Sequence, residues 1–145
     1  MILAEPMTFE LLGHPQGKGR ARSSVQGGFV RHYTPAATRS YEGMIREAAR
    51  QEMAGREPTD QPVYVRLTAI FDVPKSFSKI KRARALGNDL VPAKRPDLDN
   101  IAKAFLDAMN GVVFHDDCQV VRHDFAKVYG PAPKVVVTVT PRWTR

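Results

Sequence analysis

The sequence has little cysteine and no long apolar run, and both absences narrow the class of protein. Cys118 is the single cysteine among 145 residues, so no disulfide can form within one chain. No apolar stretch approaches the roughly 20 residues that a membrane-spanning helix needs. The opening segment MILAEPMTFELL holds two acidic residues and no basic one, which is not typical of a secretory signal. These features predict a cytoplasmic protein with no membrane partner.

Acidic residues are in the minority, and their distribution is uneven. The formal net charge is +7 and the isoelectric point is near 9.9, which favours a polyanionic partner. Residues 14–39 contain no acidic residue, and residues 75–95 contain only Asp89. Basic residues in these two blocks are Lys18, Arg20, Arg22, Arg31 and Arg39, then Lys75, Lys79, Lys81, Arg82, Arg84, Lys94 and Arg95. Residues 97–117 have a negative net charge, because they contain five aspartates and Lys103 is their only lysine or arginine.

Hydrophobic periodicity predicts an α+β fold in one domain over residues 1–145. Alternating or β-branched runs predict strands at residues 7–13, 62–73, 112–114, 119–129 and 134–140. Apolar residues at helical spacing predict helices from Thr34-Pro35 to about residue 54 and from residue 98 to 109. We expect the helices to pack on one mixed sheet, with the strand at 62–73 central.

Two basic segments interrupt these elements. Residues 14–33 are rich in Gly, Ser and Arg and predict either an arm or a hairpin that turns at residues 26–28. Residues 74–96 predict a long solvated loop with a short helix near residues 78–86. We expect the basic part of this loop, residues 75–95, to be mobile without a partner because like charges repel and apolar anchors are few.

Aspartates gather around the second predicted helix. Asp97 and Asp99 begin it, and Asp116 and Asp117 lie in a turn that follows it. If the turn packs beside the start of the helix, four carboxylates can converge, and clustered carboxylates suit Mg²⁺. Lys103, four residues after Asp99, lies on the same helix face and could neutralise the acids or stabilise a transition state. The pattern is compatible with metal-assisted phosphodiester hydrolysis.

Ordinary structural roles can also explain each of these residues. An aspartate at a helix start can cap backbone N–H groups, which would account for Asp97 or Asp99. An Asp-Asp pair is common in turns. Lys103 and Asp107 could be a simple surface pair at i, i+4. Spacing alone therefore leaves the metal site and these alternatives open.

The central segment KRPDLDNIAKAFLDAMNGVVFHDDCQVV resembles the signature of the RusA family of Holliday-junction endonucleases of bacteria and their phages. That signature is a Pro-Asp-x-Asp-Asn-x-x-Lys helix, an Asn-Gly turn and an Asp-Asp-x-Gln, and every element is present in order. Further similar segments are Pro15 to Arg22, Tyr33 to Pro35 and Pro74 to Lys79. The resemblance covers roughly residues 8–140.

The resemblance implies a homodimer that nicks opposite strands of a four-way junction in recombination and repair, with Mg²⁺ as cofactor and Mn²⁺ as a substitute. It implies metal ligation by Asp97, Asp99 and Asp117, with Asp116 as a further candidate, and a catalytic role for Lys103. Asn100 would hold the carboxylates from behind, and Asp107 would pair with Lys103. It also suggests a bacterial source, with a prophage gene as one option.

Nucleic-acid contacts transfer less directly, because only Lys94 and Arg95 directly precede the first aspartate here, whereas the founding member concentrates its arginines there. From the charge blocks we expect DNA contacts from Lys18, Arg20, Arg22, Lys75, Lys79, Lys81, Arg82, Arg84, Lys94 and Arg95.

Two other functions remain as alternatives. A catalytically silent nucleic-acid-binding module could use the same basic segments, although aspartates beside phosphates would repel them without a cation. A small-molecule phosphohydrolase would need a closed pocket. Gly17 to Arg20 lacks the spacing and the Ser or Thr of a P-loop, so no nucleotide cofactor is expected.

The expected dimer needs an apolar surface on each chain. The run Val135, Val136, Val137 and Val139 predicts such a surface, because these valines cannot all face one small core.

Overall fold

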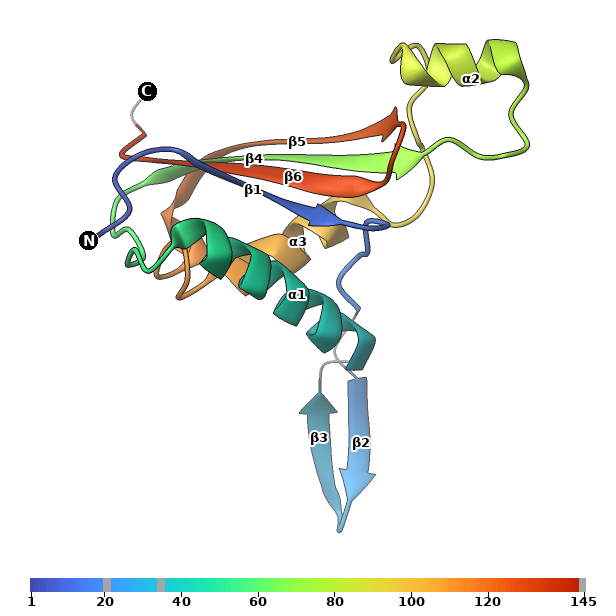
Figure 1. Ribbon diagram of the computed structural model, residues 1–145. Coiled ribbons are helices and arrows are strands. Elements are labelled where there is room, and N and C mark those ends of the chain that lie inside the picture. The colour runs from blue at the N-terminus through green and yellow to red at the C-terminus, as the bar shows by residue number, and fades with distance from the viewer. Residues whose placement is uncertain (20–21, 34–35, 144–145) are drawn as a thin grey trace.

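The computed structural model describes residues 1–19, 22–33 and 36–143. Its centre is a four-stranded sheet with the order β1-β6-β4-β5 (Figure 1). The strands are Met7–Leu12 (β1), Val63–Asp72 (β4), Val120–Gly130 (β5) and Lys134–Pro141 (β6). β4 lies inside the sheet, parallel to β5 and antiparallel to β6. The predicted α+β class, the mixed sheet and the internal position of β4 are confirmed.

One face of the sheet forms the core because alternate residues of each strand point to it. Met7, Phe9 and Leu11 of β1 are buried, while their neighbours Thr8, Glu10 and Leu12 are exposed. In β6 the side chains of Val135, Val137 and Val139 are fully buried. Only Val136 of the valine run lies on the opposite face, half-buried. The run therefore supplies the core and adds one valine to the outer face, which corrects the apolar surface predicted there.

Two helices cover the core face of the sheet from the same side (Figure 1). They are Ala36–Met53 (α1) and Leu98–Met109 (α3). The Tyr41 ring of α1 meets the Phe105 ring of α3 edge to face, with centroids 5.9 Å apart. Of the apolar residues at helical spacing in α3, Ile101, Ala102, Phe105 and Met109 are buried and Leu98 and Leu106 are half-buried. In α1, Met44 stands next to the buried Ile45 but is 52% exposed. The buried line of α1 instead runs through Thr38, Tyr41, Ile45, Ala49 and Met53.

The predicted strand at residues 112–114 is wrong. These residues form a buried turn that makes only isolated bridges, from Phe114 to Thr59 and to Asn110. Gly111 adopts a φ of 78°, which reverses the chain directly after α3, and its N–H donates to the Phe114 carbonyl at 2.7 Å. Val113 and Phe114 are apolar because the turn is buried, so their pattern resembled that of a strand.

The segment after β1 forms a hairpin that projects away from the body (Figure 1). Its strands are Arg22–Gln26 (β2) and Phe29–Tyr33 (β3), joined by Gly27 and Gly28, which both have positive φ. This settles the choice between an arm and a hairpin. The predicted helix start at Thr34-Pro35 lies outside the described residues, and α1 is described from Ala36.

The basic loop after β4 contains the expected short helix, Lys79–Leu86 (α2), which stands beyond the end of the sheet (Figure 1). The Ser78 hydroxyl caps it by accepting from the Lys81 N–H at 3.2 Å. Ala85 is fully buried, and the Phe77 ring packs edge-on against Tyr129 with centroids 6.0 Å apart. The loop therefore has apolar anchors that its sequence did not show, and its mobility stays a prediction.

The described helices include none that is both long and apolar enough to span a lipid bilayer.

Candidate active site

Asp97 and Asp99 lie at the start of α3, as predicted, and both are exposed. Asp97 occupies the N-cap position, but its side chain makes no capping hydrogen bond. Among the described residues, Asp99 accepts only from the adjacent Asn100 N–H, at 2.9 Å. Capping therefore does not account for Asp97, and its carboxylate is available for another partner.

Asp116 and Asp117 have different surroundings although they are neighbours. Asp116 caps the 3₁₀ turn Asp117–Gln119, and its Oδ2 accepts from the Cys118 N–H at 3.2 Å. Hydrogen bonds from the Cys118 thiol and N–H lower the pKa of Asp116, and the Asp116 carboxylate raises the pKa of the thiol. The ordinary turn role thus accounts for Asp116. Asp117 is left to face α3, where its Oδ2 lies 3.9 Å from the Lys103 ammonium.

The Gln119 amide holds this turn in place. Its Oε1 accepts from the N–H groups of His115 and Asp116, at 2.9 and 3.0 Å. Its Nε2 donates to the carbonyls of Thr59 and Gln61, at 2.9 and 3.0 Å. All four bonds are made by one side chain, so Gln119 fixes the two aspartates to the segment before β4. The sequence showed Gln119 only as a motif position.

Lys103 connects α3 to the aspartate turn. Its ammonium lies 3.2 Å from Asp107 Oδ1, one helical turn later, and 3.9 Å from Asp117 Oδ2. The side chain is 55% exposed, so the ammonium can also meet a ligand from solvent. Lys103 is thus a surface partner of Asp107 and, at the same time, the residue that bridges to Asp117.

Lys18 does not point to solvent as a DNA contact would. Its ammonium lies 2.9 Å from Glu42 Oε1 of α1 and 2.5 Å from Asp107 Oδ2 of α3. Burial lowers the pKa of Lys18, but hydrogen bonds to Asp107 and Glu42 outweigh it and raise the pKa above its ordinary value. The ammonium thus forms ion pairs with two carboxylates. The structure therefore shows Lys18 paired with carboxylates and not free to contact a phosphate.

Backbone contacts hold the segment around Lys18 against both helices. The Lys18 N–H donates to the Asn100 carbonyl at 3.0 Å, and the Gly19 N–H donates to the buried Thr38 hydroxyl at 2.9 Å. A Cβ on Gly17 would lie 3.2 Å from the Cβ atoms of both Asn100 and Pro96, so the two segments approach closely. Asn100 thus contacts the Lys18 segment through its backbone and by packing, and its role behind the carboxylates stays a prediction.

An open cleft of about 730 Å³ lies beside Asp97. The segment around Lys18 forms one wall, and the start of α3 with its preceding loop forms the other. Its lining residues are Pro15, Gln16, Gly17, Lys18, Arg95, Pro96, Asp97 and Asn100. The cleft gives a ligand access to the Asp97 carboxylate. The exposed Arg95 also lines it and could bind an anion.

Lys127 of β5 fastens the loop that carries Asp97. Its ammonium donates to the carbonyl of Lys94 and to that of Pro96, the latter at 3.0 Å. Lys127 shares the inward-facing parity of Phe125 and Tyr129, and a lysine at such a position was the signal that sequence reasoning missed. Glu42 was also missed. It left no local signal because its partner Lys18 is 24 residues away.

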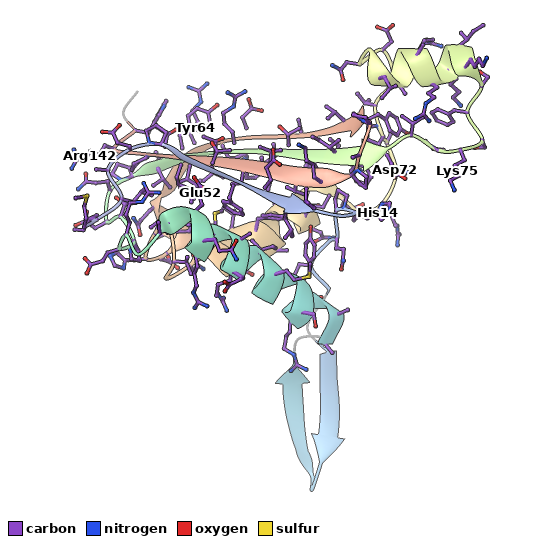
Figure 2. All side chains as sticks on the ribbon, viewed as in Figure 1. His14, Glu52, Tyr64, Asp72, Lys75 and Arg142 are labelled. Atoms are coloured by element: carbon purple, nitrogen blue, oxygen red, sulfur yellow. The ribbon has the colours of Figure 1, made fainter. Side chains whose placement is uncertain are left out.

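The remaining predicted DNA contacts lie in the basic loop at residues 74–96, and of these Arg95 lines the cleft beside Asp97. All seven of them are exposed, and Lys75 points outward from this loop in Figure 2. They are Lys75, Lys79, Lys81, Arg82, Arg84, Lys94 and Arg95. Arg20 lies outside the described residues, and Arg22 lies in β2, whose side chains are also outside them.

The carboxylates fit Mg²⁺ by their chemistry, but the structure does not gather four of them as predicted. Among residues 1–19, 22–33 and 36–143, no group of three or more His, Cys, Asp or Glu is close enough to share a metal ion. Asp117 contacts α3 through its ion pair with Lys103, and it does not form a metal-binding group with Asp97 or Asp99. Oxygen donors on α3 and on the turn would have to move closer to hold one ion.

An α+β domain with exposed aspartates, a bridging lysine and a cleft at one helix start is the arrangement expected of an enzyme that acts on phosphodiesters. Comparison with known proteins gives the particular family: residues 13–140 match the model described as endodeoxyribonuclease RusA. The chain belongs to this family. It is also 32% identical over 133 residues to the uncharacterized protein YqaN of Bacillus subtilis (strain 168), which covers 90% of this chain and 93% of that protein. Family membership supports a DNA endonuclease.

Proposed function

We propose that this protein is a Mg²⁺-dependent endonuclease that resolves four-way DNA junctions by paired nicks as a homodimer, in recombination and repair. One contact carries the proposal: the Lys103 ammonium of α3 lies 3.9 Å from Asp117 Oδ2 in the turn that follows the helix. This contact joins the two halves of the family motif in a chain whose residues 13–140 match the RusA endodeoxyribonucleases.

Asp97, Asp99 and Asp117 would hold Mg²⁺, which when bound activates a water and offsets negative charge on the phosphate. Asp116 is a weaker candidate because its carboxylate already caps the turn. Lys103, exposed and held by Asp107, would donate to a non-bridging phosphate oxygen as charge grows there. Arg95, at the cleft, would hold the neighbouring phosphate.

The DNA would be gripped by the exposed cations around α2, because their charges are free to meet phosphates. The hairpin β2–β3 is a second candidate, since it projects from the body and carries Arg22 and Arg31. A junction has four arms, so two separate basic projections suit it better than one continuous groove.

The outer face of the sheet is the candidate dimer interface. Figure 2 shows Tyr64 on this face, on the side away from α1 and α3, and Figure 1 shows no described helix over it. Half-buried side chains at its centre are Tyr64, Thr68, Ile70 and Val136. Two symmetric nicks need two sites and each chain supplies one, so a two-fold dimer matches the symmetry of the substrate.

The test is a cleavage panel. The purified protein is incubated with a labelled mobile four-way junction, a linear duplex and a single strand of the same sequence, each with Mg²⁺, with Mn²⁺ and with a chelator. We expect paired nicks in the junction alone, with either metal and not with the chelator. Binding of the junction without cleavage under all conditions would favour a silent binding module. Hydrolysis of free nucleotides alone would favour a small-molecule phosphohydrolase.

A cytoplasmic place of action fits this proposal, because its substrate is chromosomal or phage DNA and the single cysteine requires no oxidising compartment.

A further inference from the structure

Lys18 is the residue whose observed contacts differ most from its expected role. Its ammonium reaches two carboxylates from two different helices, Glu42 of α1 and Asp107 of α3. The side chains of all three residues are largely shielded, with exposed fractions of 26%, 16% and 22%. A surface lysine kept for phosphate binding would not be enclosed in this way.

The Asp107 carboxylate is shared by two lysines, one on each oxygen. Oδ2 takes Lys18 at 2.5 Å and Oδ1 takes Lys103 at 3.2 Å. Because a carboxylate is rigid and planar, an oxygen fixed by Lys18 also fixes the direction of the other oxygen. Lys103 is therefore held by a group whose own orientation depends on Lys18.

Charge gives Lys18 a second effect on Lys103. Glu42 and Asp107 are both within reach of the Lys18 ammonium, and without it they would be two largely shielded acids, of which Asp107 keeps its ion pair with Lys103. The uncompensated pair would draw the Lys103 ammonium toward α1, away from Asp117. Orientation and charge thus act in the same direction.

We propose that Lys18 is a positioning residue that sets the Lys103 ammonium against Asp117 through Asp107, with Glu42 as its second anchor. It touches neither DNA nor the reacting atoms. This inference rests on the proposed function, because Lys103 is assumed to act on the scissile phosphate. It also gives the segment that leads into the β2–β3 hairpin a link to the reaction centre, since that segment carries Lys18.

The test is a double-variant cycle on the full-length protein, with Lys18→Met, Lys103→Met and both together. Single-turnover junction cleavage is measured at saturating enzyme, so that the rate is separated from binding. We expect Lys18→Met to lower the rate about tenfold, the usual size for a residue that orients a functional group, and to leave the dissociation constant unchanged. In the Lys103→Met background the same change should have no further effect on the rate.

Lys75→Met is the matched control, because it removes one exposed lysine that has no described carboxylate partner. Its effect should fall on binding and should be the same with and without Lys103. If the rate effect of Lys18→Met is also the same in both backgrounds, Lys18 does not act through Lys103 and the inference is overturned. Lys18→Met with Glu42→Gln repeats the test in a protein with balanced charge, should Lys18→Met alone fold poorly. Its rate should stay below the wild-type rate.

Urea unfolding of the same four proteins of the cycle supplies a readout that needs no substrate. The midpoint shifts of the two single variants should not add up to that of the double variant, because both lysines use Asp107. Non-additive shifts in a protein that cleaves no junction would keep the lysine link and refute the proposed function. Additive shifts, together with an active wild-type enzyme, would refute the link and keep the function.

Discussion

The two basic regions of this protein differ in what their cations contact. Near the N-terminus, the Lys18 ammonium is held between Glu42 and Asp107. Around α2, the lysines and arginines are exposed, and none forms an ion pair with a described carboxylate. Lys81 instead lies over the Phe77 ring at 4.2 Å, with its outer side open to solvent. Basic residues that look alike in the sequence thus support two tasks: Lys18 positions a site, and the cations around α2 capture a polyanion.

The two adjacent aspartates also differ in their contacts, because Asp116 caps a turn and Asp117 faces Lys103. We expect the largest effect from a substitution at Asp117. Asp117→Asn should lower the single-turnover rate of junction cleavage by about 10²- to 10³-fold, by analogy with the loss of one group that stabilises charge in a transition state. Junction binding should persist or tighten, because one carboxylate no longer repels phosphate.

Asp116→Asn is the matched control for Asp117→Asn. It weakens a turn cap whose backbone bonds an amide oxygen can still accept, so most of the cleavage rate should remain. Equal losses in the two variants would show that the turn as a whole, and not the Asp117 carboxylate, is required.

Local patterns were sufficient for most of the fold and for part of the site. Alternation in β1 and β4 and the stripe of α3 each bury one face, so the sequence carries them directly. In β6 the strand was predicted, but three of its four valines are core where an apolar surface was expected. The motif also located Lys103 with Asp117. The turn at residues 112–114 was misjudged because burial, not strand pairing, explains its apolar residues.

Contacts between distant segments could not be predicted from this single sequence. Lys18 reaches Asp107 across 89 positions, and Lys127 reaches Pro96 across 31. Local spacing identifies neither partner, because each side chain meets its partner only after the sheet and helices have packed. Charge density therefore assigned Lys18 to DNA, and only the packed structure shows its carboxylate partners.

The second largest effect should come from the exposed loop. Replacing Lys79, Lys81, Arg82 and Arg84 together by Gln should weaken junction binding and reduce the slope of log affinity against log salt by about 0.9 for each phosphate that the variant no longer neutralises. The rate at saturating enzyme should change little. Fluorescence anisotropy over a salt series gives the slope, and an unchanged slope would move the binding surface to the hairpin.

A third prediction concerns the outer face of the sheet. Val136→Glu introduces a charge at its half-buried centre and should convert the dimer into monomers that nick one strand at a time. Sedimentation velocity and the ratio of nicked to resolved junction report this, with Val136→Ile as the control that keeps the dimer. A wild-type protein that sediments as a monomer and still makes paired cuts would refute the dimer.

The smallest effect should follow loss of the Gln119 amide. Gln119→Ala removes four hydrogen bonds in a partly exposed turn, so we expect about 1–3 kcal/mol lower free energy of unfolding. Urea unfolding measures this. An unchanged free energy of unfolding in Gln119→Ala would contradict the role of this amide in holding the turn.

The most direct test of the division between positioning and capture compares Lys18→Met with Lys81→Met in one experiment that records salt slope and single-turnover rate. We predict that Lys18→Met lowers the rate about tenfold and leaves the slope unchanged. Lys81→Met should reduce the slope by about 0.9 and leave the rate at saturating enzyme unchanged. If Lys18→Met reduces the slope as Lys81→Met does, Lys18 contacts phosphate in the complex and the two regions do the same work.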